Sequence, residues 1–408
     1  MRVCLVAATH PSNNPRLIRE ADSLAGAGHD VRVVAPSFMT ALRDRDMRLL
    51  QNRAWRLEVI DFCPGGMAGT YRAYVTRGKC RVLQKAVRLT GRRRYVDGAY
   101  TPAMREMTAL ASAEPADWFI AHAHRSLPVA AAAAHKWDAR LGFDCEDLLG
   151  EDRTGLAGQV EKAYLPQCSY ISVPSQAMGA NLALNHGPLP MIVLYNFFPT
   201  ALVSGMSPPS SRNAREIVKL HWFSQTIGEG RGIEDAIIAI SSLGSKVELH
   251  LRGEWARGYE EKVRGMAERL KVSLHVHPVL DHDLLIRQME EFDIGLALEP
   301  LSNHNAALTQ SNKIGSYFLA GMAIAATDTP GQREVLGDNP QAGFLYPSGK
   351  PEMLAAGLKR WLNNRQALCE AQKASWDIGR DRFCWDVEQT KFFAALGIAS
   401  PVGYLQTH

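Results

Sequence analysis

The sequence predicts an α/β protein of two Rossmann-like, doubly wound domains with a helical C-terminal tail. Three observations support this prediction. Short apolar strands alternate with amphipathic helices through both halves of the chain. A segment rich in Pro, Ser and Gly, residues 199–215, separates the two alternating series and is predicted to be a linker. After the second series, residues 352–396 have largely helical character.

The first series starts at the N-terminus with a strand at 2–8, a loop, a helix that ends at Gly28, and a second strand at 30–36. A stripe of apolar residues at helical spacing marks the helix, and such a unit favours a right-handed parallel crossover. Further strands are predicted at 57–63, 117–124, 141–147, 170–175 and 191–198, with helices at 127–137 and 176–184.

The second series repeats the alternation. Its strands are predicted at 217–224, 246–253, 273–279, 293–300 and 323–328, and its helices at 232–243, 258–270, 283–292 and 313–321. The first domain is therefore placed at 1–198, completed by the C-terminal helix at about 383–408, and the second at 216–382. Two such domains facing each other would form a central cleft, and ligands of doubly wound sheets bind at the carboxyl ends of the strands.

Two common nucleotide-binding classes lack their motifs here. A dinucleotide-dependent oxidoreductase needs G-x-G-x-x-G directly after a strand. The first loop, "THPSNNP", contains no glycine, and the glycines of "FSQTIGEGRGIED" have the wrong spacing. The P-loop pattern G-x-x-x-x-G-K-[ST] is also missing. The sequence therefore argues against a dehydrogenase and against a P-loop enzyme.

Cysteine use and hydropathy bear on the compartment. The seven cysteines are scattered and include no C-x-x-C pair, which favours reduced thiols and argues against a structural zinc. The N-terminal apolar run is short, so we interpret it as a buried strand and not as a signal peptide. No stretch of about 18 uninterrupted apolar residues predicts a transmembrane helix. We therefore expect a cytoplasmic protein with no bound metal and no cofactor.

Positive charge is concentrated in one segment. Residues 1–200 hold 24 Lys/Arg against 18 Asp/Glu, whereas residues 201–408 hold 22 against 24. The segment from Arg72 to Arg94 has nine basic residues and no acidic one. A basic amphipathic helix of this kind can lie on the anionic inner face of a membrane, or it can be a solvated face packed on its own domain. Nucleic acid is a less suitable partner, because few aromatic residues are interleaved with the charges.

Several stretches, in order along nearly the whole chain, resemble the retaining family 4 glycosyltransferases of the two-Rossmann GT-B fold. They are "THPSNNPRLIREADSLAGAGHDVRVVAP", "ADWFIAHAHRSLPVAAAAA", "VLYNFFP", "LHWFSQTIGEGRGIEDAIIAI", "HLRGEW" and "SNKIGSYFLAGMAIAATDTPGQREVLG". The resemblance implies transfer of a sugar from a UDP- or GDP-linked donor, with retention, to a glycan, lipid-linked or small-molecule acceptor. Two alternatives stay open: a catalytically degenerate or partner-dependent homologue that only binds, and a nucleotide-sugar epimerase on the same fold.

The donor side is expected in the second domain. Arg231 and Lys313 each precede a helix, where a cation opposes the helix dipole unless an anion lies nearby. The resemblance assigns Arg231 to the donor diphosphate; the alternative is two ordinary surface cations. The remaining donor-binding candidates are Ser224, Thr309, Ser311, Asn312 and Ser316.

Ser316 marks a departure from the family pattern. The resemblance places a glutamate at this position, where it grips the ribose hydroxyls, and a second glutamate eight residues earlier, where this chain has Leu308. A serine hydroxyl can still form a hydrogen bond, but without the charge that strengthens it. Gln225 lies near the place where the family often carries a further arginine. Both departures leave open whether the chain is an active enzyme.

The first domain is expected to hold the catalytic and acceptor residues. His122 and His124 follow a strand, and the resemblance gives one of them, preferably His124, a place beside the donor sugar, although a histidine at a strand end is often structural. Acceptor-binding candidates in the first loop are His10, Asn13, Asn14 and Arg16, which could equally reflect turn chemistry. Asp144, Glu146 and Asp147 also follow a strand and are expected to shape the acceptor side; Glu334 is expected to cap a loop.

Overall fold

A computed structural model describes residues 1–63, 67–149, 154–211 and 216–399. The chain divides into two compact units, which are described separately below. The first comprises Met1–Val173, Gly179–Val193 and the segment from Phe393 onward, and the second comprises Pro174–Met178 and Leu194–Phe392. Parts of the predicted linker (212–215) and of the predicted C-terminal helix (400–408) lie outside the described residues.

The first unit is built on a seven-stranded, fully parallel sheet with the order β3-β2-β1-β4-β5-β6-β7. Its strands are β1 (Arg2–Ala7), β2 (Asp30–Ser37), β3 (Arg56–Asp61), β4 (Trp118–His122), β5 (Arg140–Asp144), β6 (Tyr170–Val173) and β7 (Met191–Val193). The central strands are buried along almost their whole length, as expected where helices cover both faces of a parallel sheet.

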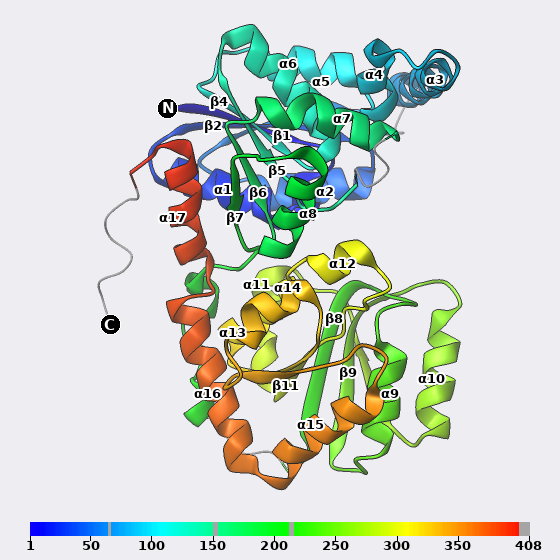
Figure 1. Ribbon diagram of the computed structural model, residues 1–408, viewed down its shortest axis with the longest axis vertical. Coiled ribbons are helices and arrows are strands. Elements are labelled where there is room, and N and C mark those ends of the chain that lie inside the picture. Colours follow the sequence, from blue (N-terminus) through cyan, green and yellow to red (C-terminus); the bar gives the residue numbers. More distant parts are fainter. Residues whose placement is uncertain (64–66, 150–153, 212–215, 400–408) are drawn as a thin grey trace. The chain divides into compact units, whose positions relative to one another are not determined.

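Helices cover both faces of this first sheet (Figure 1). They are α1 (Pro15–Gly26), α2 (Thr40–Leu50), α3 (Met67–Thr90), α4 (Val96–Tyr100), α5 (Met104–Ala111), α6 (Leu127–Trp137), α7 (Leu156–Tyr164) and α8 (Gln176–His186). Helix α1 begins at Pro15 because the side chain of Asn14 accepts a hydrogen bond from the N–H of Leu17 and Pro15 suits the first helical position.

The second unit contains a six-stranded parallel sheet with the order β10-β9-β8-β11-β12-β13. Its strands are β8 (Val218–Ile227), β9 (Val247–Trp255), β10 (Ser273–His277), β11 (Ile294–Ala297), β12 (Ala323–Thr327) and β13 (Gly343–Tyr346). Its helices are α9 (Ile233–Ser241), α10 (Tyr259–Arg269), α11 (His282–Gln288), α12 (His304–Leu308), α13 (Asn312–Ala320), α14 (Pro330–Gln332), α15 (Pro351–Asn363) and α16 (Arg365–Asp381). The division between the units falls inside the last helix, α17 (Trp385–Leu396).

Both sheets have the same doubly wound topology, which confirms the predicted fold class. In each, the chain first moves outward from a central strand, β1 or β8, and then returns to pair on its other side with β4 or β11. The point where the direction reverses is the place where ligands of such sheets bind, at the carboxyl ends of the strands. Four of the helices in the first unit, α2, α4, α5 and α7, had no counterpart among the predicted elements.

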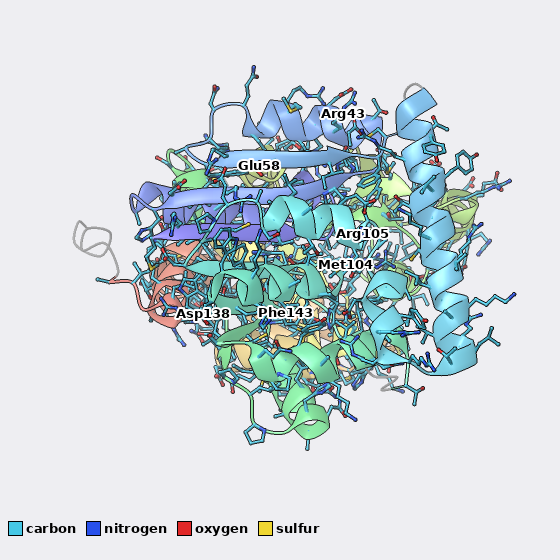
Figure 2. The ribbon with its side chains drawn as sticks, turned by 90° about the horizontal axis from the view of Figure 1, so that it is seen from above. Arg43, Glu58, Met104, Arg105, Asp138 and Phe143 are labelled. Atoms are coloured by element: carbon cyan, nitrogen blue, oxygen red, sulfur yellow. The ribbon has the colours of Figure 1, made fainter. Side chains whose placement is uncertain are left out.

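The basic segment is confirmed as a helix. Residues Met67–Thr90 form α3, which runs along one side of the first unit with side chains projecting outward (Figure 2). Among the described residues, no helix combines the length and the hydropathy that crossing a membrane would require.

Candidate functional site

The reversal point of the first sheet carries a histidine and an aspartate at the carboxyl ends of neighbouring strands. His122 is the last residue of β4 and Asp144 the last of β5, and the parallel register pairs them directly. Ala7, at the end of β1, pairs with His122 from the other side. The backbone alone therefore brings His122 and Asp144 together, as expected from their positions at two strand ends.

Helix α1 supplies a countercharge to each of these two groups. The Nη1 group of Arg16 donates to Oδ1 of Asp144 at 2.6 Å. Glu20, one turn further along α1, lies 3.1 Å from Nε2 of His122, while Nδ1 of His122 lies 3.4 Å from Asp144. Arg16, Glu20, His122 and Asp144 are each no more than 1% exposed. We call these four residues the buried charge cluster.

Protonation in the buried charge cluster follows from these contacts. Burial alone would lower the pKa of His122, but the charge of Glu20 and the nearby carboxylate of Asp144 raise this pKa to about 10. Burial likewise would raise the pKa of Asp144, yet the charge of Arg16 holds it well below its ordinary value. Burial raises the pKa of Glu20. At neutral pH, the pair formed by His122 and Glu20 therefore keeps one titratable proton. Asp144 is ionised.

His124 lies two residues further, in a short 3-10 turn (His124–Ser126), and is also enclosed. Its Nε2 lies 2.6 Å from Glu161 on α7, and the same carboxylate contacts His186 at 2.9 Å. The imidazole packs edge-on against Phe143 and is 1% exposed. The structure thus places both predicted histidines at one sheet edge, each held by acidic partners inside the first unit.

The first loop is organised around His10. Its Nδ1 lies 2.8 Å from Asp46, and its Nε2 accepts hydrogen bonds from the backbone N–H groups of Phe38 and Met39. The ring is buried and connects the segments that follow β1 and β2. Both nitrogens of this predicted acceptor residue are therefore occupied by protein groups.

The other predicted acceptor residues of this loop differ in exposure. Asn13 is exposed, whereas Arg16 belongs to the buried charge cluster. Asn14 is half-buried; its amide donates to Glu146 at 2.5 Å while its carbonyl oxygen caps α1. Burial and the charge of Asp144 raise the pKa of Glu146 to about 7. Asn13, Asn14 and Glu146 are thus the polar groups of this loop region that solvent reaches.

The reversal point of the second sheet carries a different set of charges. Lys313, in the first turn of α13, places its Nζ 2.6 Å from Oε1 of Glu299, which follows β11. The hydroxyl of Ser311 donates to the same oxygen at 2.8 Å. Arg231, which precedes α9, donates from Nη1 to the hydroxyl of Ser224 at 3.3 Å and is half-buried. We call Ser224, Arg231, Glu299, Ser311 and Lys313 the cation site, after its two cationic side chains, Arg231 and Lys313.

One carboxylate faces two cations in this site. Burial would raise the pKa of Glu299, but Lys313, the hydroxyl of Ser311 and the more distant charge of Arg231 hold it below its ordinary value. Glu299 is therefore ionised and offsets one of the two positive charges. The cation site retains one positive charge at neutral pH, beside two helix starts.

Two glycines bring these residues together. Gly232 has a φ of +71°, and a Cβ there would lie 2.8 Å from the carbonyl oxygen of Leu298, so only glycine lets the start of α9 approach the end of β11. Gly253 has a φ of +152°, and its Cβ would lie 2.5 Å from the carbonyl oxygen of Ser224. The pairing of β8 with β9 is irregular between Phe223 and Thr226. Ser224 therefore lies in a β-bulge.

The starts of α9 and α13 carry no side-chain cap. Gly232 occupies the cap position of α9, and Ser311, at the cap position of α13, directs its hydroxyl to Glu299 instead of to the helix. First-turn N–H groups of a helix that lack such a cap can bind an anion. This arrangement fits the expectation that Arg231 and Lys313 flank an anionic ligand.

The remaining donor candidates lie nearby but face other groups. Thr309 donates to the carbonyl of Asn305 at 2.7 Å, and Asn312 is exposed. Ser316 is fully buried, and its hydroxyl donates to the carbonyl of Asn312, one turn back in the same helix, at 3.1 Å. Gly331, in α14, packs its backbone against Thr309.

The sequence analysis did not identify three acidic residues that complete these clusters: Glu20, Glu161 and Glu299. Only Glu299 had a usable signal, because it directly follows a buried strand in "GLALEP". Glu334, by contrast, behaves as expected for a structural residue. Its two oxygens accept hydrogen bonds from the backbone N–H groups of Gln176 and Ala177, which belong to the same unit.

Solved structures that share this architecture include HepE, a sucrose-phosphate synthase and TarM. HepE from Anabaena, crystallised with UDP, is 17% identical with a TM-score of 0.68; the match covers 97% of this chain and 100% of that one. Sucrose-phosphate synthase from Thermosynechococcus elongatus is 14% identical with a TM-score of 0.68, over 97% and 98% of the chains.

A TarM variant from S. aureus, crystallised with UDP, fondaparinux and a GlcNAc-glycerol, is 11% identical with a TM-score of 0.70, over 97% of this chain and 99% of that one. This chain has the GT-B fold. The predicted resemblance to that fold is confirmed, whereas membership of family 4 stays a prediction. No protein-family model matches the chain, and no curated protein sequence matches it.

Proposed function

We propose that the protein is a glycosyltransferase that moves a sugar from a nucleotide donor to an acceptor, and that the cation site holds the donor diphosphate. The observation that carries this proposal is the pair Arg231 and Lys313 beside two uncapped helix starts at the reversal point of the second sheet. Glu299 neutralises only part of their charge. A nucleoside diphosphate supplies the remaining negative charge.

The chemistry of the leaving group explains why these residues would matter. Charge develops on the diphosphate as the bond to the sugar breaks, and preorganised N–H groups and cations stabilise that charge. Because the cation site is already assembled by Gly232 and Gly253, little reorganisation is needed when the donor binds. Glu299 acts as a positioning residue that holds Lys313 at the start of α13.

The donor and acceptor classes are part of this proposal. HepE and TarM were crystallised with UDP, so we propose that the nucleotide of the donor is UDP in preference to GDP. We assign the acceptor, which is a glycan, a lipid-linked or a small molecule, to the first unit near Asn13, Asn14 and Glu146. In this proposal His122 and His124 hold the adjoining strand ends of the first sheet in place. Transfer proceeds with retention, as the resemblance implies.

A homologue that binds a nucleotide without transferring sugar is the second candidate. It is favoured by Ser316, whose hydroxyl is used inside its own helix, and by Gln225, which is exposed where the resemblance leads us to expect an arginine. An epimerase has less support, because two of the acidic residues at the first reversal point, Glu20 and Asp144, are buried in ion pairs, which leaves Glu146 as the acidic group that solvent reaches beside this cluster.

A nucleotide panel separates these candidates. We expect UDP or GDP to raise Tm by several degrees, and uridine or guanosine to have little effect, because the diphosphate occupies the cation site. Release of the nucleoside diphosphate from a nucleotide sugar should then be measured with and without candidate acceptors. A thermal shift without any release favours the binding homologue, and no shift with any nucleoside diphosphate contradicts the proposed function.

We also propose that α3 attaches the protein peripherally to an anionic membrane surface. Its exposed large apolar side chains are Tyr71, Tyr74, Val82 and Leu89, each at least 68% exposed. At 100° per residue these four fall on one face, and basic residues flank that face on both sides. Leu83 and Val87 lie on the opposite, partly buried face. Exposed apolar residues bordered by cations are typical of helices that lie in a membrane interface.

Sedimentation with vesicles tests this attachment. We expect the chain to bind vesicles that contain phosphatidylglycerol and to bind pure phosphatidylcholine weakly. Replacing Tyr74 and Leu89 together by Asp should abolish binding, while the matched change of Leu184, which is 86% exposed on α8, should not. Equal binding to both lipids, or equal loss in both variants, would contradict the assignment.

A further inference from the structure

A row of imidazoles crosses three neighbouring strands of the second sheet. His221 on β8 pairs in register with His250 on β9, and His250 pairs with His275 on β10. Strands of a parallel sheet covered by helices ordinarily carry apolar side chains at such positions. His250 and His275 are not part of the cation site, and the proposed sugar transfer gives them no role.

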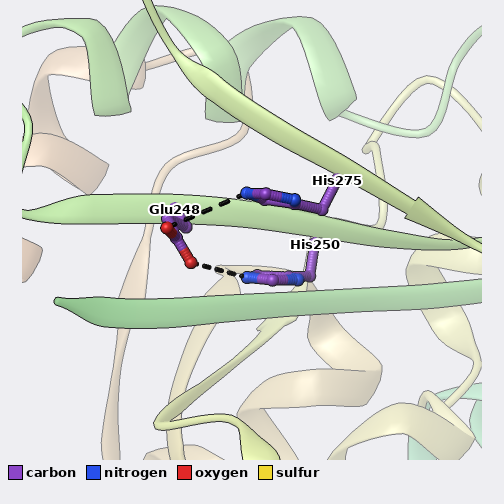
Figure 3. Close-up of side chains that lie close together, drawn as sticks. All are labelled: Glu248, His250 and His275. Atoms are coloured by element: carbon purple, nitrogen blue, oxygen red, sulfur yellow. Dashed lines mark hydrogen bonds and ion pairs between the residues drawn. The ribbon is translucent and has the colours of Figure 1, made fainter. Parts of the chain in front are cut away.

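A carboxylate joins two of these imidazoles. Glu248, two residues before His250 on β9, lies beside the stacked rings of His250 and His275 and faces both of them (Figure 3). Its Oε2 is 3.2 Å from Nε2 of His250, and its Oε1 is 3.8 Å from Nε2 of His275. The two rings are stacked, with centroids 4.6 Å apart and planes 13° from parallel. The three ligating atoms all lie within 4.8 Å of one another.

We propose that Glu248, His250 and His275 form a zinc-binding site with three protein ligands and one open position. Two imidazole nitrogens and one carboxylate oxygen are a ligand set that zinc accepts in proteins. Zinc–ligand bonds of about 2.0–2.1 Å in a tetrahedron place neighbouring ligand atoms about 3.3–3.4 Å apart. The separation of 3.2 Å between Oε2 of Glu248 and Nε2 of His250 is close to this value, whereas the 3.8 Å between Oε1 and Nε2 of His275 must shorten.

Closing the site requires movement of one side chain, that of His275, whose Nε2 lies 3.1 Å from the hydroxyl of Ser273. The ring of His275 must turn out of the stack so that its Nε2 atom points to the same place as Nε2 of His250. The side chain of His275 is 45% exposed, on the edge strand β10, whereas the side chain of His250 is 7% exposed. His250 and Glu248 therefore form the fixed part of the site, and His275 closes over the ion from the solvent side.

A fourth histidine orients the buried ligand. Nδ1 of His250 lies 3.0 Å from Nε2 of His277, two residues beyond His275 on β10. If Nδ1 of His250 donates to His277, its Nε2 keeps a lone pair directed at the ion. Ligating histidines regularly use their second nitrogen in this way.

The position of the site indicates what the ion would do. It ties the edge strand β10 to β9, and a site that exists only in the folded state stabilises that state. The open position faces solvent beside His275 and can hold water or an external ligand. Imidazole ligands favour zinc, copper and nickel, whereas Mg²⁺ prefers a shell of oxygen ligands.

Calorimetric titration of the full, untagged and chelator-treated chain with ZnCl₂ tests this proposal. We expect one zinc ion per chain in the micromolar range or tighter, and no comparable binding of MgCl₂. His275→Ala and Glu248→Gln should each weaken zinc binding at least tenfold. His135→Ala, which removes an exposed histidine on α6, should leave it unchanged. Wild-type binding that His275→Ala does not alter, or a lack of stoichiometric binding, would overturn the proposal.

Cobalt substitution provides an independent readout. Four-coordinate Co²⁺ absorbs visible light more strongly than six-coordinate Co²⁺, so the wild-type chain should develop this absorption and the His275→Ala variant should not. Because the side chain of His275 is 45% exposed on an edge strand, its replacement should leave the fold intact, which an unchanged Tm in the absence of metal would verify. Absorption of equal strength in both proteins would place the ion elsewhere and overturn the assignment. The outcome does not depend on whether the chain transfers sugars.

Discussion

The reversal points of the two sheets occupy equivalent places in the same topology, yet their charged residues are arranged in different ways. In the first unit, Arg16 and His122 are enclosed and matched by carboxyl groups. In the second unit, Arg231 and Lys313 share a single carboxylate, Glu299, at two uncapped helix starts. Fully matched charges hold a fold together, whereas an unmatched positive charge leaves a site for an anion.

The largest effect is expected from breaking the buried charge cluster. Asp144→Ala would leave the charges of Arg16 and His122 buried without their shared partner, and removal of one member of a buried ion pair costs about 3–5 kcal/mol. Urea unfolding should show this loss. Glu106→Ala, which removes an exposed carboxylate of the same unit, is the control. A loss below about 1 kcal/mol for Asp144→Ala would mean that the cluster contributes little to stability.

A change in the cation site should affect ligand binding more than folding. Lys313→Met removes one of the two positive charges and should weaken binding of a nucleoside diphosphate ten- to hundredfold, or about 1.4–2.8 kcal/mol. Lys359→Met, an exposed substitution on α15, is the matched control. If calorimetry gives the same affinity for both variants, Lys313 only anchors Glu299.

The pH dependence of stability distinguishes the two regions further. The pKa of His122 is raised to about 10 in the folded protein, so its contribution is complete below its unfolded value of about 6.5 and is lost as pH rises toward 10. This group alone would lower the free energy of unfolding by up to about 1.4 kcal/mol per pH unit in that window. His122→Gln should flatten this part of the profile. Parallel profiles for the two proteins would contradict the assigned charge.

Ser316 should give the smallest effect. Because its hydroxyl donates to the carbonyl of Asn312, Ser316→Ala should change nucleotide affinity less than twofold and stability by less than about 1 kcal/mol. Ser241→Ala, on α9, removes a comparable bond to a helix carbonyl and serves as the control. A tenfold loss of affinity for Ser316→Ala alone would show that the hydroxyl turns toward the nucleotide.

The sequence predicted the fold well because the relevant signals are local. Alternating apolar strands and helices, and the glycines near helix ends, indicate two doubly wound sheets without knowledge of distant contacts. Placing Arg231 and Lys313 at helix starts also required only neighbouring residues. Both helices begin where the spacing predicts, within a residue or two.

The partners of the charged residues could not be predicted in the same way. Glu20 meets His122 and Arg16 meets Asp144 across more than a hundred positions, and no spacing rule connects them. The same limit applies to His275 and Glu248, which come together only because β10 pairs with β9 in register. Burial was equally hidden, so His10 and His124 looked like accessible site residues in the sequence but are enclosed in the structure.

Comparing a nucleoside diphosphate with its nucleoside in wild-type and Arg231→Ala protein tests the central claim most directly. Calorimetry should show that the wild-type chain binds UDP at least a hundredfold more tightly than uridine. Arg231→Ala should reduce this preference to less than tenfold, while Arg264→Ala, on the exposed side of α10, should preserve it. A preference for the diphosphate that survives Arg231→Ala unchanged would contradict the proposal that the cation site holds the donor.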